Sequence, residues 1–229
     1  MKLLGLVGGS SWVSSGEYYA HINRMVNERV GGVDAAKLVL WSMNFGDIQR
    51  NNLANDQRAN MRLILEGCQR VEAAGAKGVM ICANTLHMFA DEIQPQIGIP
   101  IIHLVTAVAD TLKFAGITQA LLMGTKYTME MPYIREKLSA DGVEPVLPDE
   151  ADRDFMHKTI YEELVSNIFT EPTRRRYLEI IEKARGEGVE GAILACTEIP
   201  ILLEGFEVAL PTFDTLLIHS KAAADFMLS

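Results

Sequence analysis

The chain has 229 residues, of which 48% are hydrophobic and 22% charged, and its net charge at pH 7 is −9. This composition is typical of a globular protein with one large or two small domains, and the negative charge argues against a nucleic-acid partner, because phosphate binding requires a basic surface. The sequence has no apolar run long enough to cross a membrane, no secretory signal pattern and only three irregularly spaced cysteines, so we expect a cytoplasmic protein with reduced thiols and no membrane partner.

The first half of the chain is predicted to alternate short buried strands with helices. Apolar runs indicate strands at 3–7, 37–41, 79–82 and 100–102. Apolar residues at helical spacing indicate helices around 18–26 and 61–71, followed by a short one at 88–94. Cys68 falls on the second apolar stripe and is expected to be a core residue. Residues 44–52 are predicted to be a polar loop that carries Asp47 and Arg50.

The loop Gly8-Gly9-Ser10-Ser11 follows the first predicted strand and leads toward a helix. Glycines at that place suggest a bound ligand. The spacing of Gly5, Gly8 and Gly9 does not match the dinucleotide fingerprint, however, and the chain has no phosphate loop with Gly-Lys-Ser/Thr. These absences argue against nucleotide binding.

The second half repeats the alternation of strands and helices. Strands are predicted at 120–123, 143–146, 192–195 and 208–210. Helices are predicted at 104–114, up to Leu138, along the stripe 156–168, from an N-cap at Thr170 with Pro172 in the first turn, and at 213–227. The fold class is therefore α/β, with parallel sheets joined by right-handed crossovers. We expect two similar domains, 1–103 plus 210–229 and 104–209, with a ligand site in the cleft between them.

One segment of the second half has a counterpart in the first. Residues 75–85 can be laid on residues 188–198, which matches two glycines, an apolar run and a polar end. The match is offset at the cysteines, because Cys82 falls opposite Ala195 and Ala83 opposite Cys196. The chain therefore follows one plan twice, with one thiol displaced by a residue.

Cys196 ends a predicted buried strand and precedes Thr197-Glu198, which can open a helix. Ligands of open α/β sheets bind at such strand ends. Thiols at two matched strand ends suggest proton transfer to and from both faces of one carbon, because a thiolate accepts a proton and a thiol donates one. The alternative is that both are core cysteines, and this alternative is stronger for Cys82 than for Cys196.

Four motifs, Gly8–Trp12, Asn84–His87, Gly124–Glu130 and Cys196–Glu198, resemble those of the cofactor-independent aspartate/glutamate racemase family, in order along essentially the whole chain. The similarity is closest to the bacterial branch of broad-specificity or L-specific racemases. It implies two flavodoxin-like three-layer domains, frequent homodimerisation, no pyridoxal phosphate, no metal, and an amino-acid substrate held between the domains.

The resemblance also implies roles for individual residues. Cys196 would be an acid/base on one face of the substrate. The substrate-binding residues would be Ser10, Ser11 and Trp12 along the side-chain pocket, Asn84, Thr85 and Thr197 at the α-carboxylate, and Thr125 and Thr128 as further donors, with Glu198 beside them. Helix capping is the alternative for Thr85, Thr125 and Thr197, and interaction with the helix dipole is the alternative for Glu198. His87 and His219 would support the site or serve as structural histidines, and Arg50 would neutralise a carboxylate or lie on the surface.

One position departs from the family pattern. The residue before Asn84-Thr85 is the second catalytic Cys or Thr in the family, and here it is Ala83, with the thiol one residue earlier at Cys82. Consecutive side chains of a strand point to opposite faces. Either the loop bends to bring Cys82 to the substrate or the protein has one thiol base. Three functions follow as alternatives: a racemase with water, Thr85 or another group opposite Cys196, a single-thiol enzyme such as a decarboxylase, and a non-catalytic binder of amino acids or dicarboxylates.

Overall fold

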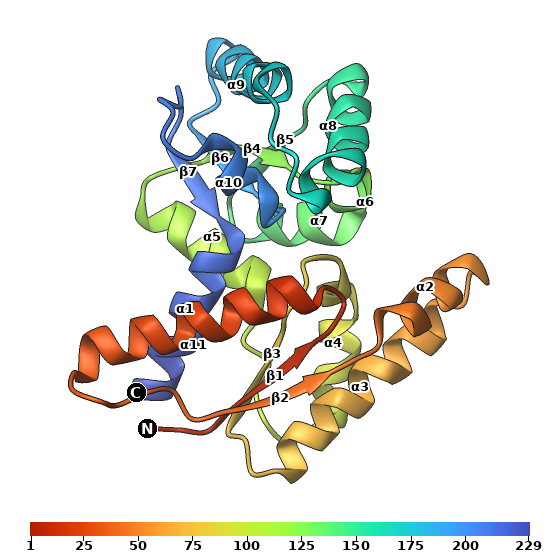
Figure 1. The fold of residues 1–229 in the computed structure, drawn as a ribbon, viewed down its shortest axis with the longest axis vertical. Helices are drawn as coiled ribbons and strands as arrows, with labels where there is room; N and C mark the ends of the chain where they lie inside the picture. The colour runs from red at the N-terminus through yellow and green to blue at the C-terminus, as the bar shows by residue number, and fades with distance from the viewer. The chain divides into compact units, whose positions relative to one another are not determined.

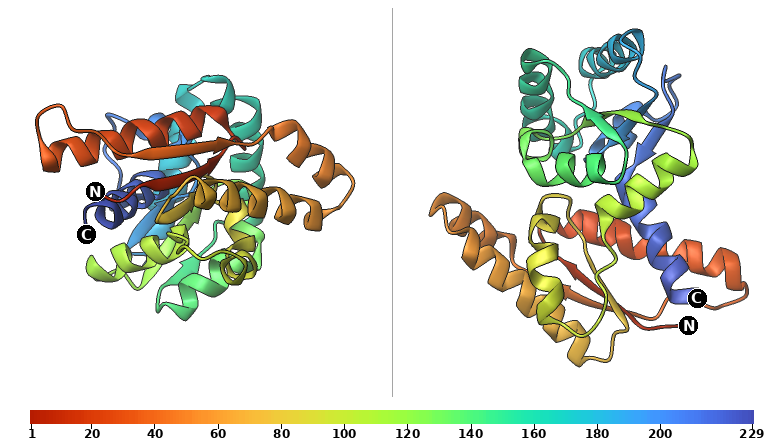
Figure 2. Two further views of the ribbon diagram at one scale, coloured as in Figure 1. Left: turned by 90° about the horizontal axis from the view of Figure 1, so that it is seen from below. Right: turned by 180° about the vertical axis from the view of Figure 1, so that it is seen from behind.

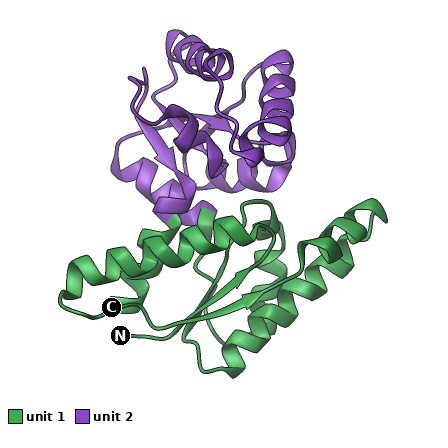
Figure 3. Cartoon of the chain, in the orientation of Figure 1, with its two compact units in different colours: residues 1–104, 219–229 green, residues 105–218 purple.

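The computed structural model describes residues 1–229 as two compact α/β units. The first unit comprises residues 1–104 and 219–229, and the second comprises residues 105–218 (Figure 3). Each unit contains one fully parallel sheet. The predicted fold class, two α/β domains with parallel sheets, is confirmed. No helix is both long enough and apolar enough to span a membrane.

The sheet of the first unit has the strand order β2-β1-β3 (Figure 1). Its strands are β1 (Leu4–Gly8), β2 (Leu38–Ser42) and β3 (Gly78–Ile81). Every residue of β1 and β3 is buried, which explains why both appear in the sequence as continuous apolar runs. The fourth predicted strand, at 100–102, is reduced to one bridge between Ile101 and Val79.

Helices cover both faces of this sheet, with α1 and the C-terminal part of α11 on one face and α3 on the other (Figures 1 and 2). The elements are α1 (Trp12–Val30), α2 (Phe45–Leu53), α3 (Gln57–Ala73), α4 (Ala90–Ile93), α11 (Thr215–Leu228) and the 3-10 helices η1 (Thr85–Phe89) and η2 (Gln94–Gln96). On the α3 face, Cys68 and Val71 belong to one core cluster with Ile81. The prediction of Cys68 as a core residue is confirmed.

The sheet of the second unit has the strand order β5-β4-β6-β7. Its strands are β4 (Gln119–Met123), β5 (Glu144–Val146), β6 (Gly191–Leu194) and β7 (Thr212–Asp214). Its helices are α5 (Leu104–Phe114), α6 (Lys126–Glu130), α7 (Pro132–Ala140), α8 (Glu150–Glu162), η3 (Leu164–Ser166), α9 (Glu171–Gly186) and α10 (Glu198–Leu203). Thr170 caps α9 as predicted, because its hydroxyl accepts a hydrogen bond from the Thr173 N–H at 3.3 Å.

Several sequence-based boundaries are wrong. The predicted loop 44–52 is mostly helix α2, whose first turn is capped by Asn44 and whose buried residue is Ile48. The predicted strand 208–210 is not a strand, since pairing with β6 begins at Thr212. This pairing also groups 210–218 with the second unit, whereas the expected ranges placed them in the first. The stripe 156–168 is broken after α8 at Asn167, whose φ is 57°.

Gly9 fixes the loop after β1. Its φ is +96°, and a Cβ at this position would clash with the backbone oxygen and nitrogen of Met43. Backbone atoms cannot move aside as a flexible side chain can, so Gly9→Ala is expected to lower the free energy of unfolding by about 3 kcal/mol.

Gly32→Ala is the matched control, because Gly32 has a φ of +62° in the same unit and a Cβ there would meet no atom within 4 Å. Gly32→Ala is expected to lower the free energy of unfolding by only about 1 kcal/mol, which is the cost of a left-handed backbone at a residue with a Cβ. Urea denaturation of both variants measures the difference, and equal losses would contradict the account of the Met43 clash.

Candidate functional site

Cys196 lies just beyond the carboxyl end of β6, one of the two central strands of the second unit. The Ala195 N–H donates a hydrogen bond to the Met123 carbonyl at 2.8 Å, which extends the pairing with β4 up to the cysteine. The loop after β4 begins at Gly124, where a Cβ would lie 3.3 Å from the Ala195 carbonyl oxygen. Cys196 and the predicted Gly124–Thr128 motif therefore lie side by side at one edge of the sheet.

The thiol of Cys196 donates a hydrogen bond to the carboxylate of Glu198. The distance from Sγ to Glu198 Oε2 is 2.9 Å, and the Thr197 hydroxyl donates to the same oxygen at 2.8 Å. Thr197 makes no capping bond with its side chain, so the capping alternative is wrong for this residue. We call these three residues, Cys196, Thr197 and Glu198, the thiol–carboxylate cluster.

The thiol–carboxylate cluster keeps the proton on sulfur. Burial is the largest cause of a pKa of Cys196 well above its usual value, followed by the negative charge and the hydrogen bond of Glu198. The backbone N–H groups of Thr197 and Glu198 lower the pKa by smaller amounts. At neutral pH Cys196 is therefore a thiol that can donate a proton, and it becomes a base only after that proton has been passed on.

Thr125 and Thr128 lie at the N-terminus of α6, which follows β4. Thr125 caps α6, since its Oγ1 accepts from the Thr128 N–H at 3.2 Å, and the two hydroxyl oxygens lie 3.1 Å apart. Thr128 is buried. The capping alternative is thus confirmed for Thr125, and capping is compatible with binding because both use the same loop.

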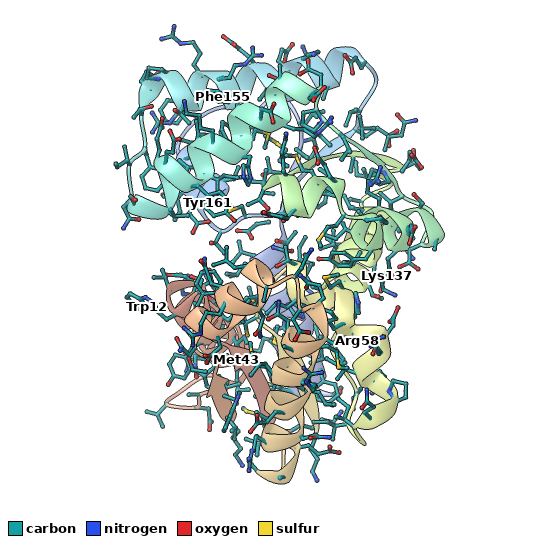
Figure 4. All side chains as sticks on the ribbon, turned by 90° about the vertical axis from the view of Figure 1, so that its right-hand side faces the viewer. Trp12, Met43, Arg58, Lys137, Phe155 and Tyr161 are labelled. Atoms are coloured by element: carbon teal, nitrogen blue, oxygen red, sulfur yellow. The ribbon has the colours of Figure 1, made fainter.

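The sequence analysis missed three rings in the second unit, those of Tyr127, His157 and Tyr161 (Figure 4 labels Tyr161). The His157 ring lies edge-on to both tyrosines, with centroid distances of 5.8 Å to Tyr127 and 4.9 Å to Tyr161. Burial and the nearby Tyr127 and Cys196 groups raise the pKa of Tyr161. In the sequence, Tyr161 directly follows Ile160 of the apolar stripe of α8, and this aromatic residue was the one indication of the ring group.

In the first unit, Cys82 lies at the end of β3 and its side chain is 2% exposed. Its N–H donates to the Val7 carbonyl at 2.9 Å, and burial raises the pKa of its thiol. Ala83 packs with the core cluster that contains Val79 and Ile81. The chain bends directly after β3, since the Ala83 N–H donates to the Ile81 carbonyl at 2.9 Å, so Cys82 and Ala83 lie outside the strand, and the bend leaves the thiol of Cys82 buried.

The other sequence-predicted residues of the first unit follow β1 and β3, which are neighbours in the sheet. Ser11 caps α1 by accepting from the Ser14 N–H at 3.2 Å, and Trp12 is 80% exposed at the start of that helix (Figure 4). Thr85 begins η1, and Asn84 precedes it without a side-chain capping bond. Arg50 is exposed and pairs with Asp47, so it lies on the surface.

The structure thus assembles the predicted residues in two sets. The first unit holds Ser10, Ser11, Trp12, Asn84 and Thr85, and the second holds Thr125, Thr128, Cys196, Thr197 and Glu198. No group of three or more His, Cys, Asp or Glu side chains is arranged to hold a metal ion. An open cavity of about 490 Å³ in the second unit is lined by Leu194, Phe206, Phe213 and Leu217 among others, and Cys196 is not among its lining residues.

Three histidines and a tyrosine of the first unit form a further group, which we call the histidine cluster: Tyr18, His87, His103 and His219. The His87 ring lies 5.0 Å from His103 and 5.2 Å from His219, between ring centroids. His219 Nε2 donates to the Ile102 carbonyl at 2.7 Å, and its Nδ1 lies 3.1 Å from the Tyr18 hydroxyl. Both His87 and His219 are buried. Burial lowers the pKa of His87 to about 4 and that of His219 well below its usual value.

Replacing Glu198 by Gln is expected to lower the pKa of Cys196, because a neutral amide no longer repels the thiolate. The measurement is the pH at which alkylation by iodoacetamide reaches half its maximal rate, with the modified residue identified by mass spectrometry. Burial raises the pKa of both Cys68 and Cys82, so they should react little in the folded protein. Glu204→Gln, an exposed position at the end of α10, is the control and should leave the midpoint unchanged. An unchanged or raised midpoint in Glu198→Gln would refute the assignment.

The low pKa of His87 makes folding sensitive to acid. Its pKa is about 4 in the folded chain and about 6.5 in the unfolded chain, so between these values the unfolded state binds the additional proton. The free energy of unfolding should therefore fall as the pH drops from 6.5 to 4, with His87 contributing about 3 kcal/mol. Urea denaturation of the unaltered protein and of His87→Asn across this range isolates that contribution, and parallel curves would contradict it.

Comparisons with known proteins agree with the motifs. A sequence model of the Asp/Glu/Hydantoin racemase family matches residues 7–223. The structure is similar over 100% of both chains to a candidate Asp/Glu racemase of Yersinia pestis, at 39% identity and a TM-score of 0.96. An aspartate racemase homologue of Pyrococcus horikoshii OT3 matches over 100% of both chains, at 28% identity and a TM-score of 0.92. The broad specificity amino-acid racemase RacX of Bacillus subtilis is 19% identical over 175 residues, which are 73% of this chain and 72% of that protein. The chain therefore belongs to the Asp/Glu/Hydantoin racemase family and is an isomerase of the racemase class.

Proposed function

We propose that the protein is a cofactor-independent amino-acid racemase of the aspartate/glutamate type, in which Cys196 transfers a proton at the substrate Cα. The observation that carries this proposal is the thiol–carboxylate cluster, because it presents an ionisable thiol, hydrogen-bonded to a carboxylate, at the carboxyl end of a central strand. Proton transfer by a positioned side chain requires such a group within hydrogen-bond reach of its partner.

Racemisation needs two proton movements at one carbon. One group removes the Cα proton, and the electron pair of the broken C–H bond stays on carbon as a carbanion next to the α-carboxylate. A second group then delivers a proton to the opposite face, so that only the configuration has changed. In the second unit Cys196 carries its proton, so the sulfur first delivers a proton to the carbanion and acts as a base in the reverse direction, once it is a thiolate.

Hydrogen-bond donors near the sulfur supply the binding site that we propose. Thr197 follows Cys196 directly, and Thr125 and Thr128 lie at the N-terminus of α6, after the neighbouring strand β4. Asn84 and Thr85 are the corresponding residues of the first unit. We propose that these donors hold the α-carboxylate and that Ser10, Ser11 and Trp12 line the side-chain pocket. The names of the relatives make aspartate and glutamate the first substrates to test.

The group that acts opposite Cys196 is not a second exposed thiol in this proposal. Ala83 has no proton to transfer, and Cys82 is buried, whereas Cys196 is partly exposed. Water or Thr85 would exchange the proton on that face. The same observations favour a second candidate, a single-thiol enzyme that protonates a carbanion from one face after carbon dioxide has left.

Substitution of the cysteines tests the proposal. Cys196→Ala should abolish inversion of aspartate or glutamate, while Cys82→Ala should retain it within a few fold. Ala83→Cys should raise the rate of inversion, because it places a thiol directly before the proposed donors Asn84 and Thr85. Chiral chromatography measures the two enantiomers over time for each variant.

Circular dichroism of each variant checks that the fold is intact. Loss of activity in folded Cys82→Ala would assign the second proton transfer to Cys82 and refute its exclusion. Full activity in Cys196→Ala would overturn the proposed mechanism. Release of carbon dioxide from a malonate-type substrate, without inversion of any amino acid, would favour the single-thiol candidate.

A further inference from the structure

His87 makes a hydrogen bond that reaches back to the strand end in the first unit. Its Nδ1 lies 2.8 Å from the carbonyl oxygen of Ala83, four residues earlier in the chain. A carbonyl oxygen only accepts, so this ring nitrogen must carry the proton. The other nitrogen, Nε2, is buried and has no hydrogen-bond partner, which agrees with a neutral ring protonated at Nδ1.

His219 has the opposite tautomer. Its Nε2 lies 2.7 Å from the Ile102 carbonyl and must carry the proton, which leaves Nδ1 to accept from the Tyr18 hydroxyl at 3.1 Å. The His219 ring is therefore fixed at both nitrogens, and the His87 ring packs edge-on against it at 5.2 Å. The histidine cluster thus restrains the His87 ring on one side by packing and at Nδ1 by the bond to Ala83.

The Ala83 carbonyl belongs to the same rigid peptide unit as the Asn84 N–H. In a trans peptide these two groups point in opposite directions, so a fixed carbonyl also fixes the direction of the Asn84 N–H and the start of η1. This peptide links the position where the thiol is displaced, Cys82-Ala83, to the proposed donors Asn84 and Thr85. A small error in such a peptide would misplace both donors.

A packing role alone does not explain the residue type. A buried imidazole carries a polar nitrogen without a partner, which an apolar ring of the same size would avoid. Burial holds the pKa of His87 at about 4, so at neutral pH the ring is uncharged and does not attract the substrate carboxylate. What only the imidazole supplies is the donor at Nδ1.

From this geometry we propose that His87 is a positioning residue: its Nδ1–H holds the Ala83 carbonyl and thereby orients Asn84 and Thr85 toward the substrate α-carboxylate. The inference depends on the proposed function for the substrate, while the hydrogen bond itself is independent of it. Loss of the hydrogen bond between His87 and Ala83 should misplace Asn84 and Thr85, and should therefore lower kcat more than it changes KM.

Two variants of His87 separate the donor from the ring. In His87→Asn the amide nitrogen can replace Nδ1, so kcat should stay within a few fold of the unaltered protein. In His87→Phe the ring remains without a donor, and kcat should fall on the order of 100-fold. His21→Asn, at a solvent-accessible position on α1 paired with Glu17, is the matched control for the Asn substitution. Equal kcat values for His87→Phe and the unaltered protein would overturn the inference, as would equal losses in folded His87→Asn and His87→Phe.

Nuclear magnetic resonance gives a readout that does not require turnover. Long-range 15N spectra of the unaltered protein should assign the Nδ1–H tautomer to His87 and the Nε2–H tautomer to His219 at pH 7. The amide resonances of Asn84 and Thr85 should move in His87→Phe and stay near their positions in His87→Asn. An Nε2–H or charged His87 would overturn the inference. Absence of turnover in the unaltered protein, with these spectra as expected, would instead count against the proposed function alone.

Discussion

The chemistry proposed for this protein depends on one hydrogen bond, that between the Cys196 thiol and the Glu198 carboxylate. Burial alone would make the thiol inert, because it disfavours the thiolate. A carboxylate at 2.9 Å adds to that effect, so the proton stays on sulfur and the thiol is a proton donor. Since Thr197 donates to the same oxygen, the carboxylate is held in one orientation. The second unit therefore holds a protonated thiol in place through the two residues that follow it.

The first unit is limited by the burial of its thiol just after β3. Ala83 packs against the core cluster on the α3 face, and Cys82, at the bend that follows the strand, is 2% exposed. If the thiol of the first unit stood at residue 83, it would match Cys196 of the second unit. In this chain only the Cys196 thiol lies beside polar donors. The two units thus share one plan of parallel strands and helices, while the proton transfer that we propose uses the thiol of the second unit. The histidine cluster shapes the strand end that remains in the first copy.

The fold was predictable where a buried element appears in the sequence as a run of apolar residues. Strands β1, β3 and β6 are buried throughout and appear as uninterrupted apolar runs. Helix α2 was missed because Ile48 is its only buried residue, while its other large apolar residues, Phe45 and Leu53, are exposed. Strand β7 was misplaced because its three residues are defined by pairing with β6 and not by their own hydrophobicity.

The same distinction applies to the candidate site. Cys196, Thr197 and Glu198 are neighbours in sequence, so a local motif was sufficient to find them, although their shared hydrogen bonds required coordinates. The contact of His87 with His219 joins residues far apart in the chain, and no local pattern could indicate it. His157 and Tyr161 were missed for a related reason, because they lie beside an apolar stripe that already had a structural explanation.

Proton exchange at the substrate Cα is the most direct test of the central claim. The purified protein would be incubated in deuterium oxide, without added cofactor, with L- and D-aspartate and L- and D-glutamate, and the α-proton signal followed by NMR. The account predicts loss of that signal for at least one of the four, together with formation of the opposite enantiomer. Retention of the α-proton signal in all four would contradict proton transfer by Cys196 to aspartate or glutamate.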